Sequence, residues 1–227
     1  MLEPMLLLSI DTCGPSGSVA LGRVAREGVE ILGQIELEGR SYSAMLVAAV
    51  SELLARSGVE LKNLTATVAV NGPGSFTGVR VGLSAVKGLA EAAQIPVVAV
   101  SRLEVMAAKA GLESAALDAH RHEVFLRLGR PDHKATEMLA GAPELSRIHP
   151  AGARIAVCDD AATALLASAW PDIELVRTPP PTAADALELC VPRALAGKFT
   201  DLALLDGHYL RRSDAEIFGE PAAPQRI

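Results

Sequence analysis

The residues best placed to do chemistry lie in a glycine-rich stretch from Asn71 to Ala90. An apolar strand leads into it, and Ser75 and Thr77 stand where a helix begins and free N–H groups can receive an anion. A Walker A loop would need a Lys and a hydroxyl after the last glycine, but a Val and an Arg stand there. The glycine spacing is also one residue too long for a dinucleotide fingerprint. Two interpretations of Ser75 and Thr77 therefore stay open, an anion site or a simple helix cap.

A carboxylate closes the first predicted strand. Asp11 is followed by Thr12, and in several nucleotide-binding folds such a carboxylate holds a metal or a water near phosphates. An Asp at a strand end also commonly makes an Asx turn. Asp11, Thr12 and Ser75 are therefore the candidates for a cofactor site, although we expect the chain alone to bind no cofactor. Cys13 comes next, but no His lies near it in sequence to form a nucleophile–base pair.

Three polar residues form the most metal-like group in the chain. Asp118, His120 and His122 alternate along a segment that we predict to be a strand, so their side chains would share one face. Further ligands at a suitable spacing are lacking, and a solvated strand face is the other interpretation. We predict no metal site and no catalytic residue.

Composition limits the classes of function. The net charge is -6 and no long basic stretch is visible, so any nucleic acid would be held mainly by another subunit. The three cysteines are far apart and lack CxxC spacing, which argues for a reducing compartment. The apolar run of residues 5–10 is too short for a signal peptide or a membrane span. We expect a cytoplasmic protein without membrane contact.

The elements that must position these residues follow a β-β-β-α-β-α-β order, which predicts an α/β fold with a mixed sheet. The predicted strands cover residues 5–10, 18–24, 29–37, 65–70 and 95–100, and the helices 41–56 and 78–92. The pattern then begins again more weakly, with strands at 114–119, 123–128 and 154–158 and helices at 160–169 and 183–196. We predict a first lobe over residues 1–102 and a second over 103–227, with a frayed tail from residue 221.

The helix after the glycine-rich turn carries small residues on one side. At three- and four-residue spacing, that side consists of Gly78, Gly82, Ala85 and Leu89. A neighbouring apolar stripe consists of Val79, Leu83, Val86 and Ala90. The apolar material covers more of the circumference than packing on one sheet requires. The helix is therefore either clasped within its own chain or packed against another subunit.

Three sequence blocks in the first half are specific enough to suggest a family. They are LLLSIDTCGPSGSVAL, NGPGSFTGVRVGLSAVKGLA and IPVVAVSRLEVMA, followed more weakly by ALDAHRHEVF and HYLR. These blocks resemble the TsaB (YeaZ) family, the partner subunits in bacterial synthesis of threonylcarbamoyladenosine (t6A) in tRNA. The resemblance implies the actin and sugar-kinase (ASKHA) fold, with two ribonuclease-H-like lobes of βββαβα type, the second one reduced.

The resemblance also implies a partner surface. In this family two helices of the first lobe pair with the catalytic subunit TsaD, or with a second copy when TsaD is absent. The implied contact residues are Tyr42, Met45, Leu46, Ala49, Val50, Phe76, Gly78, Arg80, Gly82, Leu83, Ala85, Val86 and Leu89. TsaD holds a metal with an HxxxH pair on the helix that corresponds to residues 41–56, which contain no His here. The chain also departs from typical TsaB sequences at Tyr42, where a His is usual, and at His120, where an Arg is usual.

These observations favour a non-catalytic subunit. The resemblance implies that it would bind and stabilise TsaD, and help bind the ATPase TsaE, during threonylcarbamoyl transfer to N6 of adenosine 37 in tRNAs reading codons that begin with adenine. Contact with tRNA would be indirect, and ATP or ADP would bind only within the complex. The alternative is an enzyme acting alone, either ATPase-like and nucleotide-binding or glycoprotease-like. Such an enzyme needs a nucleophile–base pair, a metal or phosphate loops in both lobes, and we can assemble none of these from the sequence.

Overall fold

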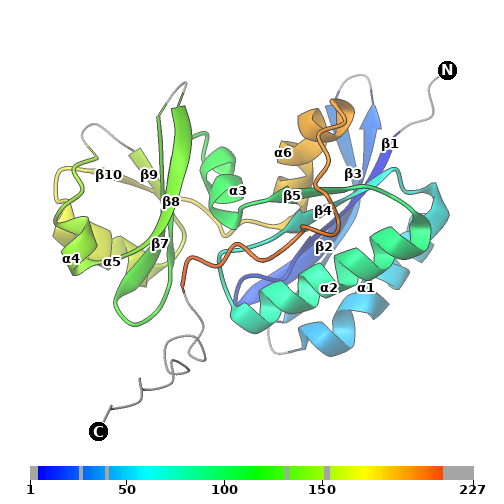
Figure 1. Cartoon of the computed structure of the whole chain (residues 1–227), viewed down its shortest axis with the longest axis horizontal. Helices are drawn as coiled ribbons and strands as arrows, with labels where there is room; N and C mark the ends of the chain where they lie inside the picture. Colours follow the sequence, from blue (N-terminus) through cyan, green and yellow to red (C-terminus); the bar gives the residue numbers. More distant parts are fainter. Residues whose placement is uncertain (1–4, 26–27, 39–40, 131–132, 151–153, 212–227) are drawn as a thin grey trace, which may run out of the picture.

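Two five-stranded sheets organise the chain, each in its own lobe (Figure 1). The computed structural model describes residues 5–25, 28–38, 41–130, 133–150 and 154–211. The predicted frayed tail from residue 221 lies outside these described residues.

The first sheet is built around β1 (Met5–Asp11). This strand pairs antiparallel with β2 (Ser16–Ala25), which in turn pairs with β3 (Gly28–Glu38). On its other side β1 pairs parallel with β4 (Ala66–Val70), and β4 pairs parallel with β5 (Val97–Val100). All of β4 and the last five residues of β1 are buried, as expected for strands that helices cover on both faces.

Helices cover both faces of the first sheet. The helices α1 (Tyr42–Arg56) and α2 (Phe76–Ala93) lie side by side on one face, and α6 (Ala183–Leu195) lies on the other (Figure 1). The boundary that we predicted at residue 102 stays a prediction, but the packing adds α6, from late in the sequence, to the first lobe. Within the described ranges, no helix is both long and apolar enough to cross a membrane.

The second sheet repeats the strand order of the first. Its strands lie in the order β10-β9-β6-β7-β8, so each sheet reads 3-2-1-4-5 when its strands are numbered within the lobe. These strands are β6 (Ser114–Asp118), β7 (Glu123–Arg130), β8 (His133–Gly141), β9 (Arg154–Val157) and β10 (Glu174–Arg177). The helices of this lobe are α4 (Ala142–Leu145), α5 (Asp160–Ala169) and α3 (Arg102–Lys109), and the buried side of α3 packs on β6, β7 and β9. Because α4 has four residues and α1 fifteen, the second lobe is the smaller version of the same plan.

The C-terminal segment, residues 197–211, returns across both lobes. Thr200 donates its backbone N–H to the carbonyl oxygen of Val97 at 2.7 Å and forms a bridge beside β5. His208 donates its backbone N–H to the carbonyl oxygen of Asn71 at 2.7 Å. Arg211 then pairs with Glu123 at the start of β7. The segment therefore connects the first lobe to the second near the end of the described chain.

Sequence patterns missed five of the elements that the structure describes. The unpredicted ones are α3, α4, β8, β10 and the 3₁₀ helix η1 (Leu61–Asn63). The strands β8 and β10 lie at the edges of their sheet, where side chains are only partly buried and apolar alternation is weak. The helix α2 begins at Phe76, two residues before the predicted start, because Ser75 caps it.

Candidate functional site

The glycine-rich turn packs directly against the loop that follows β1. Ser75 donates its backbone N–H to the carbonyl oxygen of Cys13 at 2.8 Å, and the buried Thr12 hydroxyl donates to the carbonyl oxygen of Gly78 at 2.7 Å. A Cβ built on Gly74 would lie 2.1 Å from the Cys13 carbonyl oxygen, and one on Gly78 would lie 2.1 Å from that of Thr12. Glycine is required at both positions because the two backbones touch. The backbone of this turn therefore packs against its own chain, whereas the backbone of a phosphate-binding loop faces its ligand.

Ser75 acts as the cap of α2. Its Oγ accepts a hydrogen bond from the backbone N–H of Gly78 at 3.2 Å, which satisfies one of the free donors of the first helical turn. Of the two interpretations of Ser75, the geometry supports the cap. Thr77 is exposed on the first turn of the same helix.

Asp11 is almost fully buried and is satisfied within the chain. Its Oδ1 accepts the backbone N–H of Cys13 at 2.8 Å, which forms an Asx-type turn. Its Oδ2 lies 3.5 Å from Nε of Arg102, whose side chain is also buried. The guanidinium thus supplies the positive charge that a buried carboxylate needs. Sequence reasoning missed this role of Arg102, because a single Arg after a strand carries no motif.

The thiols are held in their protonated, unreactive form. Burial, reinforced by the nearby Asp11 charge, raises the pKa of Cys13 well above its ordinary value. The Cys13 thiol donates to the carbonyl oxygen of Val70 at 3.3 Å. Burial also raises the pKa of Cys158 and raises the pKa of Cys190 to about 12. Because the thiolate is the nucleophile, none of the three is activated for covalent catalysis.

The predicted strand through Asp118, His120 and His122 is wrong. The strand β6 ends at Asp118 and β7 begins at Glu123, and the three residues from His120 to His122 have φ angles of 59°, 57° and 60°. A tight left-handed turn therefore replaces the strand, in a sequence without a Gly or Asn to signal it. Asp118 is engaged locally, with Oδ2 2.9 Å from His120 Nδ1. Among the described residues, no three His, Cys, Asp or Glu side chains are grouped to hold a metal ion.

Most of the contact residues implied by the family resemblance lie in the chain's own core. Tyr42 donates its hydroxyl to the carbonyl oxygen of Gly14 at 2.8 Å, and burial raises its pKa. Gly82 faces Thr12, whose Oγ1 would lie 2.3 Å from a built Cβ. The buried members are Tyr42, Leu46, Ala49, Val50, Gly78, Gly82, Leu83 and Val86. The side of α2 that carries Gly78 and Gly82 is therefore packed against its own chain. Of the remaining members, Met45, Phe76 and Arg80 are exposed, and Ala85 and Leu89 are half-buried.

A different set of residues forms the outward surface of these helices. We call it the α1/α2 face; its members are Ala44, Val47, Ala48, Ser51 and Ala55 on α1, and Val81, Ser84, Ala85 and Gly88 on α2. Val47 is 67% exposed, and a Cβ built on Gly88 would meet nothing within 4 Å. The face combines short side chains with apolar character, which allows another helix to approach closely.

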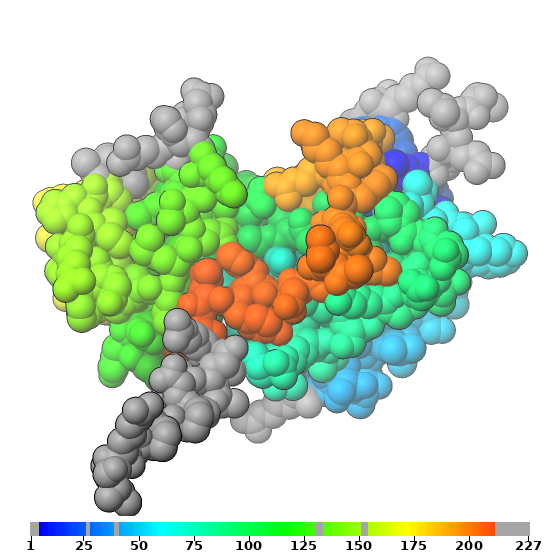
Figure 2. Space-filling model, in the orientation of Figure 1, coloured from blue at the N-terminus to red at the C-terminus, as the bar shows by residue number. Residues whose placement is uncertain are grey.

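A cleft of about 760 Å³ lies between α2 and the C-terminal segment. Figure 2 shows this segment, in orange and red, crossing the surface above α2. At the start of α2, the Arg80 guanidinium lies 3.7 Å from the centroid of the Phe76 ring, and that centroid lies 5.2 Å from the Tyr209 ring centroid. The lining residues are Phe76, Arg80, Leu83, Ser84, Lys87, Leu205, Asp206, Tyr209, Leu210 and Arg211. The last three residues of the HYLR block, Tyr209 to Arg211, supply part of this wall.

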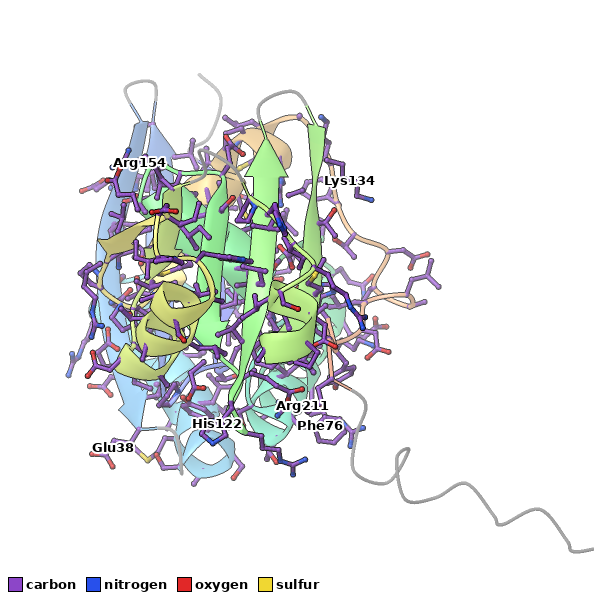
Figure 3. All side chains as sticks on the ribbon, turned by 90° about the vertical axis from the view of Figure 1, so that its left-hand side faces the viewer. Glu38, Phe76, His122, Lys134, Arg154 and Arg211 are labelled. Carbon is purple, nitrogen blue, oxygen red and sulfur yellow. The ribbon has the colours of Figure 1, made fainter. Side chains whose placement is uncertain are left out.

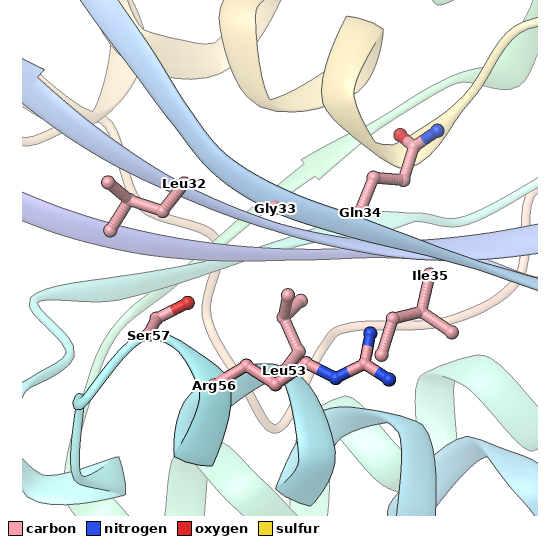
Figure 4. Close-up of a pocket in the computed structure, with 7 residues that line it drawn as sticks. All are labelled: Leu32, Gly33, Gln34, Ile35, Leu53, Arg56 and Ser57. Carbon is pink, nitrogen blue, oxygen red and sulfur yellow. The ribbon is translucent and has the colours of Figure 1, made fainter.

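A smaller hollow of about 270 Å³ lies between β3 and the end of α1 (Figure 4). Leu53 packs against Gly33, where a built Cβ would lie 2.8 Å from its Cδ1. Gln34 points away from α1 and accepts the backbone N–H of Ala184 at 3.1 Å (Figure 4). Arg56 is the one charged residue of the lining, so the hollow presents no group of catalytic side chains.

Sequence comparisons identify relatives over about half of the chain. The family model for TsaD, described as tRNA N6-adenosine threonylcarbamoyltransferase, matches residues 32–138. The tRNA threonylcarbamoyladenosine biosynthesis protein TsaB of Escherichia coli (strain K12) is 36% identical over 127 residues, which are 53% of each chain. TsaB of Bacillus subtilis (strain 168) is 37% identical over 128 residues, 55% of each chain. The chain thus spans about half the length of the curated relatives it matches.

Structural comparison extends the similarity to both lobes. YeaZ from Pseudomonas aeruginosa superposes with a TM-score of 0.72 and 27% identity, covering 91% of this chain and 100% of that one. A second Pseudomonas aeruginosa structure, described as a protein with similarity to peptidase YEAZ, gives 0.74 and 28% over the same shares. The two-lobed α/β fold of ASKHA type that we predicted is thereby confirmed.

Proposed function

The chain is a TsaB-like (YeaZ-like) protein, and from this premise we propose that it is the non-catalytic partner subunit in t6A synthesis. In this role it binds and stabilises a TsaD-type catalytic subunit and helps to recruit the ATPase TsaE. It forms a homodimer through the same surface when the catalytic subunit is absent. The reaction it supports is threonylcarbamoyl transfer to N6 of adenosine 37 in tRNA.

The observation that carries this proposal is the α1/α2 face. Val47 is 67% exposed, and it stands among alanines on a helix whose opposite side fills the core. Exposed apolar side chains that adjoin one another on two neighbouring helices are typical of a protein–protein contact. Two helices of a partner would complete a four-helix bundle with α1 and α2.

The remaining features of the role follow from charge and from the paired site residues. With a net charge of -6, the chain is suited to indirect contact with tRNA, and we propose a cytoplasmic location. Any ATP or ADP would bind within the assembled complex, since Asp11 and Thr12 are engaged inside the chain. The glycoprotease-like and ATPase-like alternatives gain no support from the described residues, because Cys13 is buried and protonated and Asp11 is paired with Arg102.

One substitution on the α1/α2 face tests the proposal. Ala48→Glu places a charge at an exposed position of α1, so folding is expected to be unchanged while association with TsaD from the same cells weakens more than about tenfold, or 1.4 kcal/mol. Ala167→Glu makes the same change at an exposed position of α5 in the second lobe and serves as the control. Binding is measured by calorimetry and co-elution.

Two results would contradict the proposal. Equal binding by the Ala48→Glu and Ala167→Glu variants would remove the α1/α2 face as the contact surface. Reconstituted tRNA modification that proceeds equally well without this chain would remove the proposed role itself.

A further inference from the structure

The cleft between α2 and the C-terminal segment gathers positive charge on a chain whose net charge is negative. Arg80, Ser84 and Lys87 line one wall at i, i+4 and i+7, so they lie on one face of α2. Seven residues of helix separate the two cations by about 10 Å along the axis. Arg211 and Asp206 contribute from the facing segment.

Two of these cations have no carboxylate partner among the described residues. Arg211 pairs with Glu123 and donates to the carbonyl oxygen of His120, so its charge is used within the chain. In the part of the chain that the structure describes, no carboxylate pairs with Arg80 or Lys87.

Arg80 is also held in position before any ligand arrives. Its guanidinium stacks over the Phe76 ring at 3.7 Å, a contact that uses the face of the group. The N–H donors at the edge of the guanidinium stay free to bind a carboxylate in bidentate fashion. The Asp206 carboxylate accepts the backbone N–H of Gly207 at 2.7 Å, so part of its hydrogen-bonding capacity is used in its own turn.

The remaining lining is apolar and aromatic. Leu83 and Leu205 are buried at the floor, and Phe76 and Tyr209 are each 38% exposed beside the cations. A volume of about 760 Å³ lies in the range of ordinary ligand sites and admits a few residues of extended peptide. The complementary ligand combines carboxylates with an apolar or aromatic side chain.

We propose that this cleft receives an acidic peptide segment of the protein that docks on the α1/α2 face. The inference rests on the proposed function, since it names a second contact of the same partner. Ser84 belongs both to the cleft and to the α1/α2 face, so the two surfaces are continuous along α2. Two cations are too few for a nucleic-acid backbone, which is normally held by many phosphate contacts.

The test is a charge reversal with a matched control. Lys87→Glu is expected to weaken binding of TsaD from the same cells more than about tenfold at 50 mM salt, and the difference is expected to shrink at 300 mM salt. Lys134→Glu makes the same change at an exposed residue at the opposite end of the molecule from Phe76 and Arg211 (Figure 3), and it is expected to bind as wild type does. Both variants are compared by calorimetry.

The outcomes separate the two proposals. If wild-type chain fails to bind TsaD, the proposed function is overturned and this inference with it. If wild type binds and the Lys87→Glu and Lys134→Glu variants bind equally, only the inference is overturned. A photo-cross-linking residue at position 84 supplies a second measurement, in which a cross-linked TsaD peptide with at least two Asp or Glu residues supports the proposal. Cross-links to a peptide without carboxylates or to RNA, or ATP binding by the isolated chain that Lys87→Glu abolishes, would overturn it.

Discussion

Gly82 and Gly88 stand in the same helix but meet opposite surroundings. A Cβ on Gly82 would lie 2.3 Å from the Thr12 hydroxyl, which is itself fixed by its hydrogen bond to Gly78. A Cβ on Gly88 would meet nothing within 4 Å. Packing inside the chain therefore requires glycine at position 82. Gly88 instead leaves the helix backbone without a side chain on the α1/α2 face.

Alanine at these two positions is expected to change stability in opposite directions. Gly82→Ala forces a methyl group against Thr12 and is expected to destabilise the fold by about 1–3 kcal/mol. Gly88→Ala is expected to stabilise it by up to about 1 kcal/mol, because alanine is the better helix former. Urea unfolding measures both changes, and a destabilisation of equal size would contradict the assigned environments.

At this scale the sequence allowed some roles to be predicted and hid others. The cap at Ser75 follows from its position before a helix, so it could be foreseen as one of two interpretations. That Gly82 faces the inside of the chain could not be predicted, because both faces of α2 carry small residues. Only the position of the Thr12 loop shows which face is buried. Arg102 was hidden for a similar reason, since its partner Asp11 is far away in sequence.

At the scale of elements, α6 supplies a whole layer of the first lobe from late in the sequence. Leu187 is fully buried on this helix, and a Cβ built on Gly22 of β2 would lie 2.8 Å from its Cδ2. Periodicity predicted the helix itself correctly, but periodicity does not say which sheet a helix covers. The prediction of a strand at His120 to His122 was wrong for a different reason. Polar residues alternate there as they do on a strand, although the backbone forms a turn.

Two leucines of α6 test this packing. Leu187→Ala is expected to destabilise the chain by about 2–5 kcal/mol, since it opens a cavity between α6 and β2. Leu195 is 61% exposed on the same helix, and Leu195→Ala is expected to change stability by no more than about 0.5 kcal/mol. Denaturant unfolding of both variants provides the measurement, and similar losses would show that α6 does not form this layer.

At the scale of the whole molecule, Glu137 joins the lobes. Its buried carboxylate accepts the hydroxyl of Ser101 at 2.6 Å and the guanidinium of Arg127 at 2.7 Å, and it lies 2.8 Å from Nε2 of His208. Burial by itself would raise the pKa of Glu137, but the hydrogen bonds from His208, Ser101 and Arg127 outweigh it and hold the pKa below its ordinary value. The sequence offered no sign of this residue, because its partners come from three separate segments.

The lowered pKa of Glu137 gives a pH dependence with a definite sign. A carboxylate whose folded pKa lies below its unfolded value of about 4.3 stabilises the fold above that pH, and the contribution is lost as the pH falls through the folded value. Glu137→Gln is therefore expected to cost at least about 2 kcal/mol at pH 7, and the difference from wild type is expected to shrink below about pH 4. Unfolding measured from pH 3 to pH 8 checks this, with Glu174→Gln at an exposed ion pair as the control. A difference that does not vary with pH would contradict the assignment.

The return of the C-terminal segment has a mechanical consequence. The chain passes between the lobes after β5, again between β10 and α6, and a third time as residues 205–211 reach Glu137 and Glu123. A flexible hinge between two lobes needs few chain connections. The three connections within the described residues resist both bending and twisting of one lobe relative to the other. A protein bound to the first lobe would therefore hold the second lobe in a fixed orientation. A further subunit could then bind the second lobe in that orientation.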